Sequence, residues 1–227
     1  MFLRSSYALL GLLLLSACKR DPLPDLVHFA FVIPVSISPG ADTVARGDTL
    51  WLTANFSDSL LDLRSNQRYR LRAQDIPLIS SVGFNQLMGA GQFSRGAAPS
   101  FAVVNQVGQL RPGGPTFRRF EPVYDGQYYR ARIGIIPQVS GIYALSLLST
   151  LQDPFGPNRP LPFLQVSPDA DGNPRRAILD DVYYVINNGN THFALQQQNS
   201  YVTADQPGAP ELSVYYERKG TFSFVVK

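Results

Sequence analysis

Short runs in which apolar and polar residues alternate recur along most of this chain, and such runs predict β-strands. Within residues 50–56 the apolar side chains occupy every second position, with Trp51 and Thr53 on the opposite face. Residues 221–226 alternate in the same way. A period of two buries one face of a strand and leaves the other in solvent, as in antiparallel sheets. The segments expected to form strands are residues 27–37, 49–56, 69–74, 100–107, 128–136, 141–149, 182–186, 192–197, 212–217 and 221–226.

Glycine and proline separate these runs, with 18 of each in the chain. They predict turns and loops, the longest of which cover residues 85–99, 108–122 and 151–176. No helical pattern is sustained, and a single helical turn is expected within residues 85–93. The Asn-Asn-Gly-Asn run at residues 187–190 predicts a hairpin turn, because Asn and Gly tolerate a positive φ.

Many short strands without long helices predict an all-β fold, an antiparallel β-sandwich with long loops. We expect this sandwich to form one domain over residues 27–227. A second domain starting near Ser167 would hold only about 60 residues, too few for an independent core without a disulfide or a metal. The chain holds one cysteine, so its stability must come from packing.

One stretch indicates which kind of sandwich to expect. Ser140-Gly141-Ile142-Tyr143-Ala144-Leu145 resembles the Ser-Gly-x-Tyr-x-Cys stretch of immunoglobulin folds. The resemblance implies that Tyr143 forms a tyrosine corner, in which the hydroxyl bonds back to the backbone. Leu145 stands where that family has its core cysteine, so the disulfide of the family is absent. The turn at residues 46–48 is also common in bacterial immunoglobulin-like modules, and the sandwich is therefore expected to be immunoglobulin-like.

The N-terminal residues follow the order of a secretory signal: a basic residue, an apolar run and small residues. Arg4 precedes the apolar residues 7–15, and Leu15-Ser16-Ala17-Cys18 ends the run. The run is too short to cross a bilayer, which takes about 20 apolar residues. Leu-Ser-Ala-Cys resembles the lipobox of bacterial lipoproteins, which implies that residues 1–17 are a removed signal peptide and that Cys18 is lipidated. An ordinary cleaved signal or a short membrane anchor is the alternative.

Residues 18–26 would then be a tether between the lipid and the domain. Pro22 and Pro24 favour an extended spacer over a helix. The charged residues that follow Cys18 resemble the export signals of surface lipoproteins in Bacteroidota-type bacteria. This resemblance implies export, a lipid anchor in the outer membrane and exposure at the cell surface.

Net charge and composition exclude one class of partner. The formal net charge is +3, whereas nucleic-acid-binding domains concentrate Lys and Arg far more heavily. We therefore expect no nucleic-acid partner.

Catalytic residues are poorly represented. His28 and His192 each fall in an expected strand and lie far apart in the sequence. No Gly-x-Ser-x-Gly motif positions a serine nucleophile, and lipidation of Cys18 would exclude a cysteine nucleophile. We therefore expect neither an enzyme nor a cofactor. A hydrolase built on a β scaffold stays open as an alternative, because aspartates are available as acids.

One segment has the oxygen spacing of a calcium loop. Asp169, Asp171 and Asn173 fall at positions 1, 3 and 5, and Asp180 falls at position 12. Position 6, which calcium loops fill with glycine, is Pro174. An ordinary Asp/Asn/Gly turn is therefore the favoured interpretation, and no metal is expected.

Two segments combine arginines with tyrosines at strand spacing. If the two strands were neighbours, their arginines and one tyrosine would line one sheet face. Guanidinium groups suit sulfate, phosphate and carboxylate, because they donate two parallel hydrogen bonds. The alternative is a solvated face whose arginine stems cover apolar surface. The candidate binding residues are Arg68, Arg70, Arg72, Tyr128, Arg130 and Arg132.

These observations predict a lipid-anchored, non-catalytic binding or structural module of the cell envelope. Its partners would be the membrane, through the lipid, and either an extracellular glycan or a neighbouring envelope protein. The alternatives are an extracytoplasmic hydrolase and an accessory subunit of an envelope complex.

Overall fold

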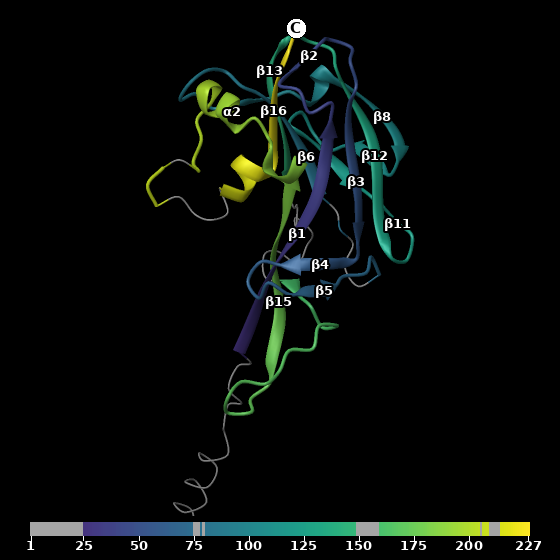
Figure 1. Cartoon of the computed structure of the whole chain (residues 1–227), viewed down its shortest axis with the longest axis vertical. Helices are drawn as coiled ribbons and strands as arrows, with labels where there is room; N and C mark the ends of the chain where they lie inside the picture. Colours follow the sequence, from purple (N-terminus) through teal and green to yellow (C-terminus); the bar gives the residue numbers. More distant parts are fainter. Residues whose placement is uncertain (1–24, 75–77, 79, 149–158, 205, 209–213) are drawn as a thin grey trace, which may run out of the picture.

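A computed structural model describes residues 25–74, 78, 80–148, 159–204, 206–208 and 214–227 (Figure 1). The lipobox, Cys18 and the first part of the predicted tether lie outside the described residues. In the part that is described, no helix is long and apolar enough to span a membrane.

The described strands form two sheets. The nine-stranded sheet has the order β11-β12-β3-β1-β15-β14, with β4 pairing to β1 and β5, and β8 pairing to β12. Its strands are β1 (Asp25–Ser38), β3 (Leu50–Ser57), β4 (Ser59–Asp62), β5 (Arg68–Arg70), β8 (Phe101–Val107), β11 (Val123–Tyr124), β12 (Tyr128–Pro137), β14 (Arg159–Pro160) and β15 (Arg175–Ile186).

The seven-stranded sheet has the order β2-β16-β13-β6-β10-β9, with β7 pairing to β6. Its strands are β2 (Thr43–Val44), β6 (Ser80–Gln86), β7 (Arg95–Gly96), β9 (Gln109–Pro112), β10 (Phe117–Glu121), β13 (Gly141–Leu148) and β16 (Thr221–Val226). Four short helical segments join these strands: η1 (Ala98–Ser100), η2 (Asn187–Gly189), α2 (Phe193–Asn199) and the π-helix η3 (Val214–Lys219).

The core lies between the two sheets and is rich in aromatic rings. From the first sheet, β3 contributes Leu50 and Leu52, both fully buried. From the second, β16 contributes Phe222 and Phe224, and the ring of Phe224 lies 6.2 Å from that of Tyr143. The faces that the alternation marked as apolar are thus the buried faces. The predicted all-β sandwich is confirmed.

Two strand pairs are parallel rather than antiparallel. β1 pairs with β15 over residues 25–35 and the length of β15, and β16 pairs with the short β2. In Figure 1, β1 and β15 point the same way and extend together below the sandwich. Alternation alone does not reveal strand direction, so these pairings could not be predicted from it.

Tyr143 occupies the place expected from the immunoglobulin-like stretch. Its side chain is buried, and its hydroxyl is directed back towards the carbonyl oxygen of Ser140, 3.5 Å away. Burial raises the pKa of the Tyr143 hydroxyl. The ring of Phe101 packs edge-on against it at 5.0 Å.

Two predicted strands are helical in the structure. Residues 192–197 were expected to form a strand, but His192 has a φ of 55° and starts α2. Residues 214–219, which overlap the expected strand 212–217, form η3 instead. The expected hairpin turn is also wrong, because residues 187–189 form η2 and lead into α2. Apolar runs of five or six residues do not distinguish a strand from a helix.

The opposite error occurs in the predicted loops, which contain strand residues. The segment 108–122 contains β9 and β10, which pair with each other. The single helical turn expected in residues 85–93 is absent, because β6 continues to Gln86 and a loop follows. The strand expected over residues 69–74 is limited to the three residues of β5.

Candidate binding face

Three of the six candidate binding residues lie together on the outer face of the first sheet. On β12, Tyr128, Arg130 and Arg132 are exposed, while the alternate residues Tyr129 and Ala131 are buried. β3 lies on one side of β12 and β8 on the other. In this register Arg130 is opposite Asn55 and Arg132 is opposite Thr53.

Arg132 lies over the ring of Trp51, the single tryptophan of the chain. Its guanidinium carbon lies 4.4 Å from the centre of the Trp51 ring, and its Nε donates to Oε1 of Gln106 at 2.8 Å. Gly134 makes room for the indole, since a Cβ there would lie 3.3 Å from a carbon of the Trp51 ring. Among the described residues, the terminal nitrogens of Arg132 have no recorded partner. The guanidinium is therefore oriented by two contacts and keeps its outer edge available.

Gln106 reaches Arg132 because of a β-bulge. β8 and β12 shift register at this point: Val107 is opposite Arg132 and Asn105 is opposite Ile133, which leaves Gln106 as the extra residue. Bulges redirect side chains relative to the regular pleat. No sequence pattern indicated a role for Gln106, whereas Trp51 already lay on the predicted polar face of its strand.

Arg130 differs from Arg132 because an acid pairs with it. Its Nη2 lies 3.0 Å from Oδ2 of Asp125, and its guanidinium lies 5.7 Å from the centre of the Tyr128 ring. Hydrogen bonds from the backbone N–H groups of Tyr128 and Gln127, together with the charge of Arg130, lower the pKa of Asp125. The net positive charge of this face therefore comes from Arg132.

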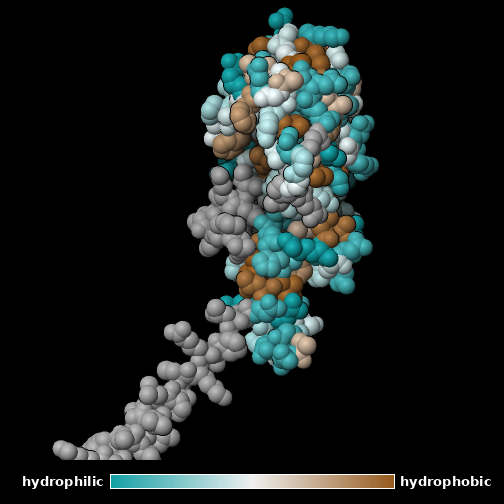
Figure 2. Space-filling view, turned by 90° about the vertical axis from the view of Figure 1, so that its left-hand side faces the viewer, coloured by the Kyte–Doolittle hydropathy of each residue, from teal (hydrophilic) through white to brown (hydrophobic). Residues whose placement is uncertain are grey.

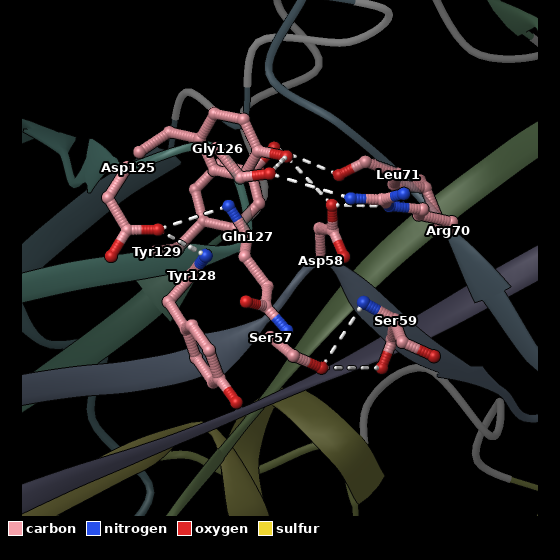
Figure 3. A network of polar contacts seen from close by, with 11 residues as sticks. Ser57, Asp58, Ser59, Arg70, Leu71, Asp125, Gly126, Gln127, Tyr128 and Tyr129 are labelled. Atoms are coloured by element: carbon pink, nitrogen blue, oxygen red, sulfur yellow. Dashed lines mark hydrogen bonds and ion pairs between the residues drawn. The ribbon is translucent and has the colours of Figure 1, made fainter.

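Arg70 belongs to a polar network that extends to the turn at residues 125–128, as Figure 3 shows. Its Nε donates to Oδ2 of the buried Asp58 at 2.8 Å, and the hydroxyl of Tyr124 donates to the same oxygen at 2.7 Å. Nearby, the hydroxyl of Tyr129 donates to the carbonyl oxygen of Leu71 at 3.0 Å. These bonds connect β4 and β5 to the turn before β12. They stabilise the fold and pair the charge of Arg70 with that of Asp58.

The charge of Asp58 is sustained by this network. Burial by itself raises the pKa of Asp58, but the hydrogen bonds from Arg70 and Tyr124 outweigh burial, and the pKa lies below its ordinary value. Asp58 is therefore ionised at neutral pH and acts as a fixed acceptor for both donors.

The condition under which the arginines of both segments would share one sheet face is not met, because β5 and β12 are not neighbouring strands. β5 pairs with β4, whereas β12 pairs with β3, β8 and β11. Arg68 donates to the carbonyl oxygen of Ser59 at 2.8 Å, and Arg72 follows the end of the short β5. The arginines of the two segments thus lie on different parts of the sheet.

The segment with the oxygen spacing of a calcium loop forms hydrogen bonds within itself. Oδ1 of Asp169 accepts hydrogen bonds from the backbone N–H groups of Asp171 and Asn173, at 2.9 and 2.8 Å. Hydrogen bonds from Asn173 and Asp171 lower the pKa of Asp169. Asp180 lies on β15 and bonds to His28 and Arg64. The bonds to Asp169 form the Asp/Asn/Gly turn that the sequence favoured. Within the described residues no three His, Cys, Asp or Glu side chains gather as a metal site.

Comparison with known proteins adds little to this geometry. No family model matches the sequence, and no curated protein matches it. Among solved structures, a non-cellulosomal cohesin from the hyperthermophilic archaeon Archaeoglobus fulgidus is similar over 70% of this chain and 91% of its own, with 6% identity and a TM-score of 0.21. At this level of similarity the fold rests on the strand order described above, and no function follows.

Proposed function

We propose that this chain is a non-catalytic module that binds acidic glycans through the outer face of β3, β12 and β8. The observation that supports the proposal is the arrangement of Arg132 on Trp51, with Gln106 fixing its Nε. A guanidinium held in one orientation loses less conformational entropy when it binds. Its free edge matches a carboxylate or a sulfate, both of which accept two parallel hydrogen bonds.

The neighbouring side chains suit a sugar chain laid along the strands. Asn55 and Tyr128 are exposed on the same face, and they can donate to and accept from hydroxyl groups. Arg130 and Arg132 are two residues apart on one strand, so their Cα atoms lie about 6.6 Å apart. The face is therefore a row of polar groups that includes one strong anion-binding group, the guanidinium of Arg132.

The non-catalytic part of the proposal is supported by the two histidines. His28 Nδ1 lies 2.6 Å from Asp180, and Nδ1 of His192 lies 2.9 Å from the carbonyl oxygen of Ser223, beside the ring of Phe222. The two rings lie on different elements, and neither lies on the face that carries Arg132.

We further propose that a lipid on Cys18 holds the module in the outer membrane, with the domain at the cell surface. The chain from Cys18 to Asp25 can span at most about 25 Å. In Figure 1 the chain enters β1 at the lower end of the molecule, and β12, β3 and β8 lie in the upper part. A lipid at that end would leave the proposed glycan face accessible.

Affinity electrophoresis tests the proposed function. The full chain is run through gels that contain polygalacturonate, a polymer of uronates, or dextran, a neutral polymer. We expect retardation by polygalacturonate alone, which weakens as salt is added, because salt screens exposed charges. Equal migration in both gels would contradict the proposal.

A further inference from the structure

A pocket lies at the other end of the first sheet, where β1 begins. Its volume is about 520 Å³, and it is lined by the start of β1, the turn between β4 and β5, residues 165–167 and the start of β15. Figure 2 shows the lower part of the molecule as narrower than the sandwich, with hydrophobic residues in separate patches among hydrophilic ones.

A second β-bulge shapes the polar side of this pocket. β1 and β15 shift register between Phe29 and Ala30, which pair with Leu179 and Asp181 and leave Asp180 as the extra residue. The carboxylate of Asp180 accepts from Nη2 of Arg64 at 2.5 Å through one oxygen. Its other oxygen lies 2.6 Å from Nδ1 of His28. Asp180 thus positions two residues that line the pocket.

The acidic groups around the pocket are satisfied by internal hydrogen bonds. Oδ1 of Asp62 accepts from the N–H of Ala30 at 2.8 Å, and its Oδ2 accepts from both the N–H and the hydroxyl of Ser65. Asp180 uses both of its oxygens, as described above. The oxygens of both carboxylates are therefore occupied by donors of the protein itself.

Donors, in contrast, remain available. Arg64 uses one terminal nitrogen for Asp180, and Arg175 uses Nε for Asp25 at 3.0 Å. The side chain of Arg64 is 58% exposed, and so is that of Asp25, the partner of Arg175. Ion pairs with an exposed member are weak enough to rearrange around a ligand. Both arginines line the pocket, and they reach it from different elements.

The remaining wall of the pocket is apolar. Val27, Phe29 and Val166 line it, and the ring of Tyr69 packs edge-on against that of Phe29 at 5.0 Å. An occupant that fits both walls carries an anionic group and an organic part.

We propose that this pocket binds an organic phosphate, with Arg64 and Arg175 as ligands of the phosphate group and the apolar wall in contact with the rest of the molecule. Arginine forks match phosphate oxygens, and two forks from different elements approach a tetrahedral group from different sides. The phosphate can belong to a soluble ester or to a lipid headgroup. This site is separate from the glycan face and does not depend on it.

The two histidines of the chain provide a direct test. His28 lines the pocket, whereas His192 packs against Phe222 and serves as an internal control. The full chain, labelled with ¹³C on its histidine rings and held in a neutral detergent, is titrated at constant pH and ionic strength with glycerol 3-phosphate. In a parallel titration, vesicles of phosphatidylcholine are compared with vesicles that also contain phosphatidic acid.

We expect the His28 ring signals to shift with saturation while the His192 signals stay in place. Saturation with glycerol 3-phosphate identifies a site open to soluble esters, and a response to phosphatidic acid alone identifies a lipid headgroup. Arg64→Gln and Arg175→Gln should each weaken binding roughly tenfold or more, and the matched variant Arg119→Gln on β10 should bind as the wild type does. The proposal is overturned if neither compound shifts His28 with saturation, or if the variants of Arg64 and Arg175 bind as the wild type does.

Discussion

Arginines that occur in similar sequence patterns make different contacts in this molecule. Arg70 and Arg132 both alternate with apolar residues in the sequence. Arg70 is bonded to the buried Asp58, whereas Arg132 rests on Trp51 and presents its outer edge to solvent. Periodicity places a side chain on a face, but the partner that it meets depends on which strands come together. For this reason the sequence predicted Tyr128, Arg130 and Arg132 on one face and could not separate Arg132 from Arg70.

The bond between Arg70 and Asp58 leads to a pH prediction. The pKa of Asp58 in the folded state lies below its ordinary value of 3.8. The stabilisation is therefore present above that ordinary value and is lost as the pH falls through the lowered pKa. In Arg70→Gln the pKa of Asp58 should rise, so the acid loss of stability should begin at a higher pH.

The measurement is the melting temperature of both proteins between pH 2 and pH 7. The difference between the two curves should be a few degrees at neutral pH and should shrink towards pH 2. The pKa values of Asp125 and Asp169 are also lowered. These two residues are present in both proteins, so their effects cancel in the difference between the two curves. A difference that is constant across the pH range would contradict the role of Asp58.

At the scale of elements, alternation predicted the strands that have one buried and one solvated face, such as β3 and β12. Alternation also predicted β16 as a strand, but it did not indicate that both faces of β16 are buried. β16 buries Thr221 and Ser223 as well as its aromatic residues, because α2 and η3 also contact this strand. At its edge the N–H of Ser223 bonds to the carbonyl oxygen of Thr191. The bulges that place Gln106 and Asp180 add one residue to a strand, and no periodic pattern reveals them.

Phe222 should be critical for stability because β16 is covered on both sides. The side chain is fully buried, and Phe222→Ala should lower the free energy of unfolding by about 3–5 kcal/mol. Phe93→Ala is the matched control, since Phe93 is 81% exposed, and it should change that free energy by less than about 0.5 kcal/mol. Urea denaturation measures both values. Similar losses in the two variants would show that β16 is not part of the cooperative core.

At the scale of the whole molecule, the sequence predicted two sheets around one core but not how the long strands are arranged. The parallel pairing of β1 with β15 joins residues about 150 positions apart, as in the pair Asp25 and Arg175. The local pattern of apolar and polar residues does not predict a pairing between strands so far apart in the sequence. The pairing creates a lower end, where the chain enters from the predicted tether, and an upper part that carries the proposed glycan face (Figure 1).

The proposed lipid at Cys18 predicts where the protein resides. Cys18→Ala should abolish incorporation of radiolabelled palmitate and release the protein from the membrane fraction, since the proposed anchor is covalent lipid. Ser16→Ala changes a neighbouring residue but keeps the cysteine, and it should preserve labelling. Palmitate labelling of Cys18→Ala equal to that of the wild type would rule out the anchor.

The central claim is that Arg132, oriented by Trp51 and Gln106, binds the acidic group of a glycan. Isothermal titration calorimetry of the full chain with an oligogalacturonide tests it most directly, with Arg119→Gln on the opposite sheet as the control of equal charge. We predict that Arg132→Gln raises the dissociation constant roughly tenfold or more and that Arg119→Gln leaves it unchanged. Equal affinity in Arg132→Gln and the wild type, or an equal loss in both variants, would contradict the account.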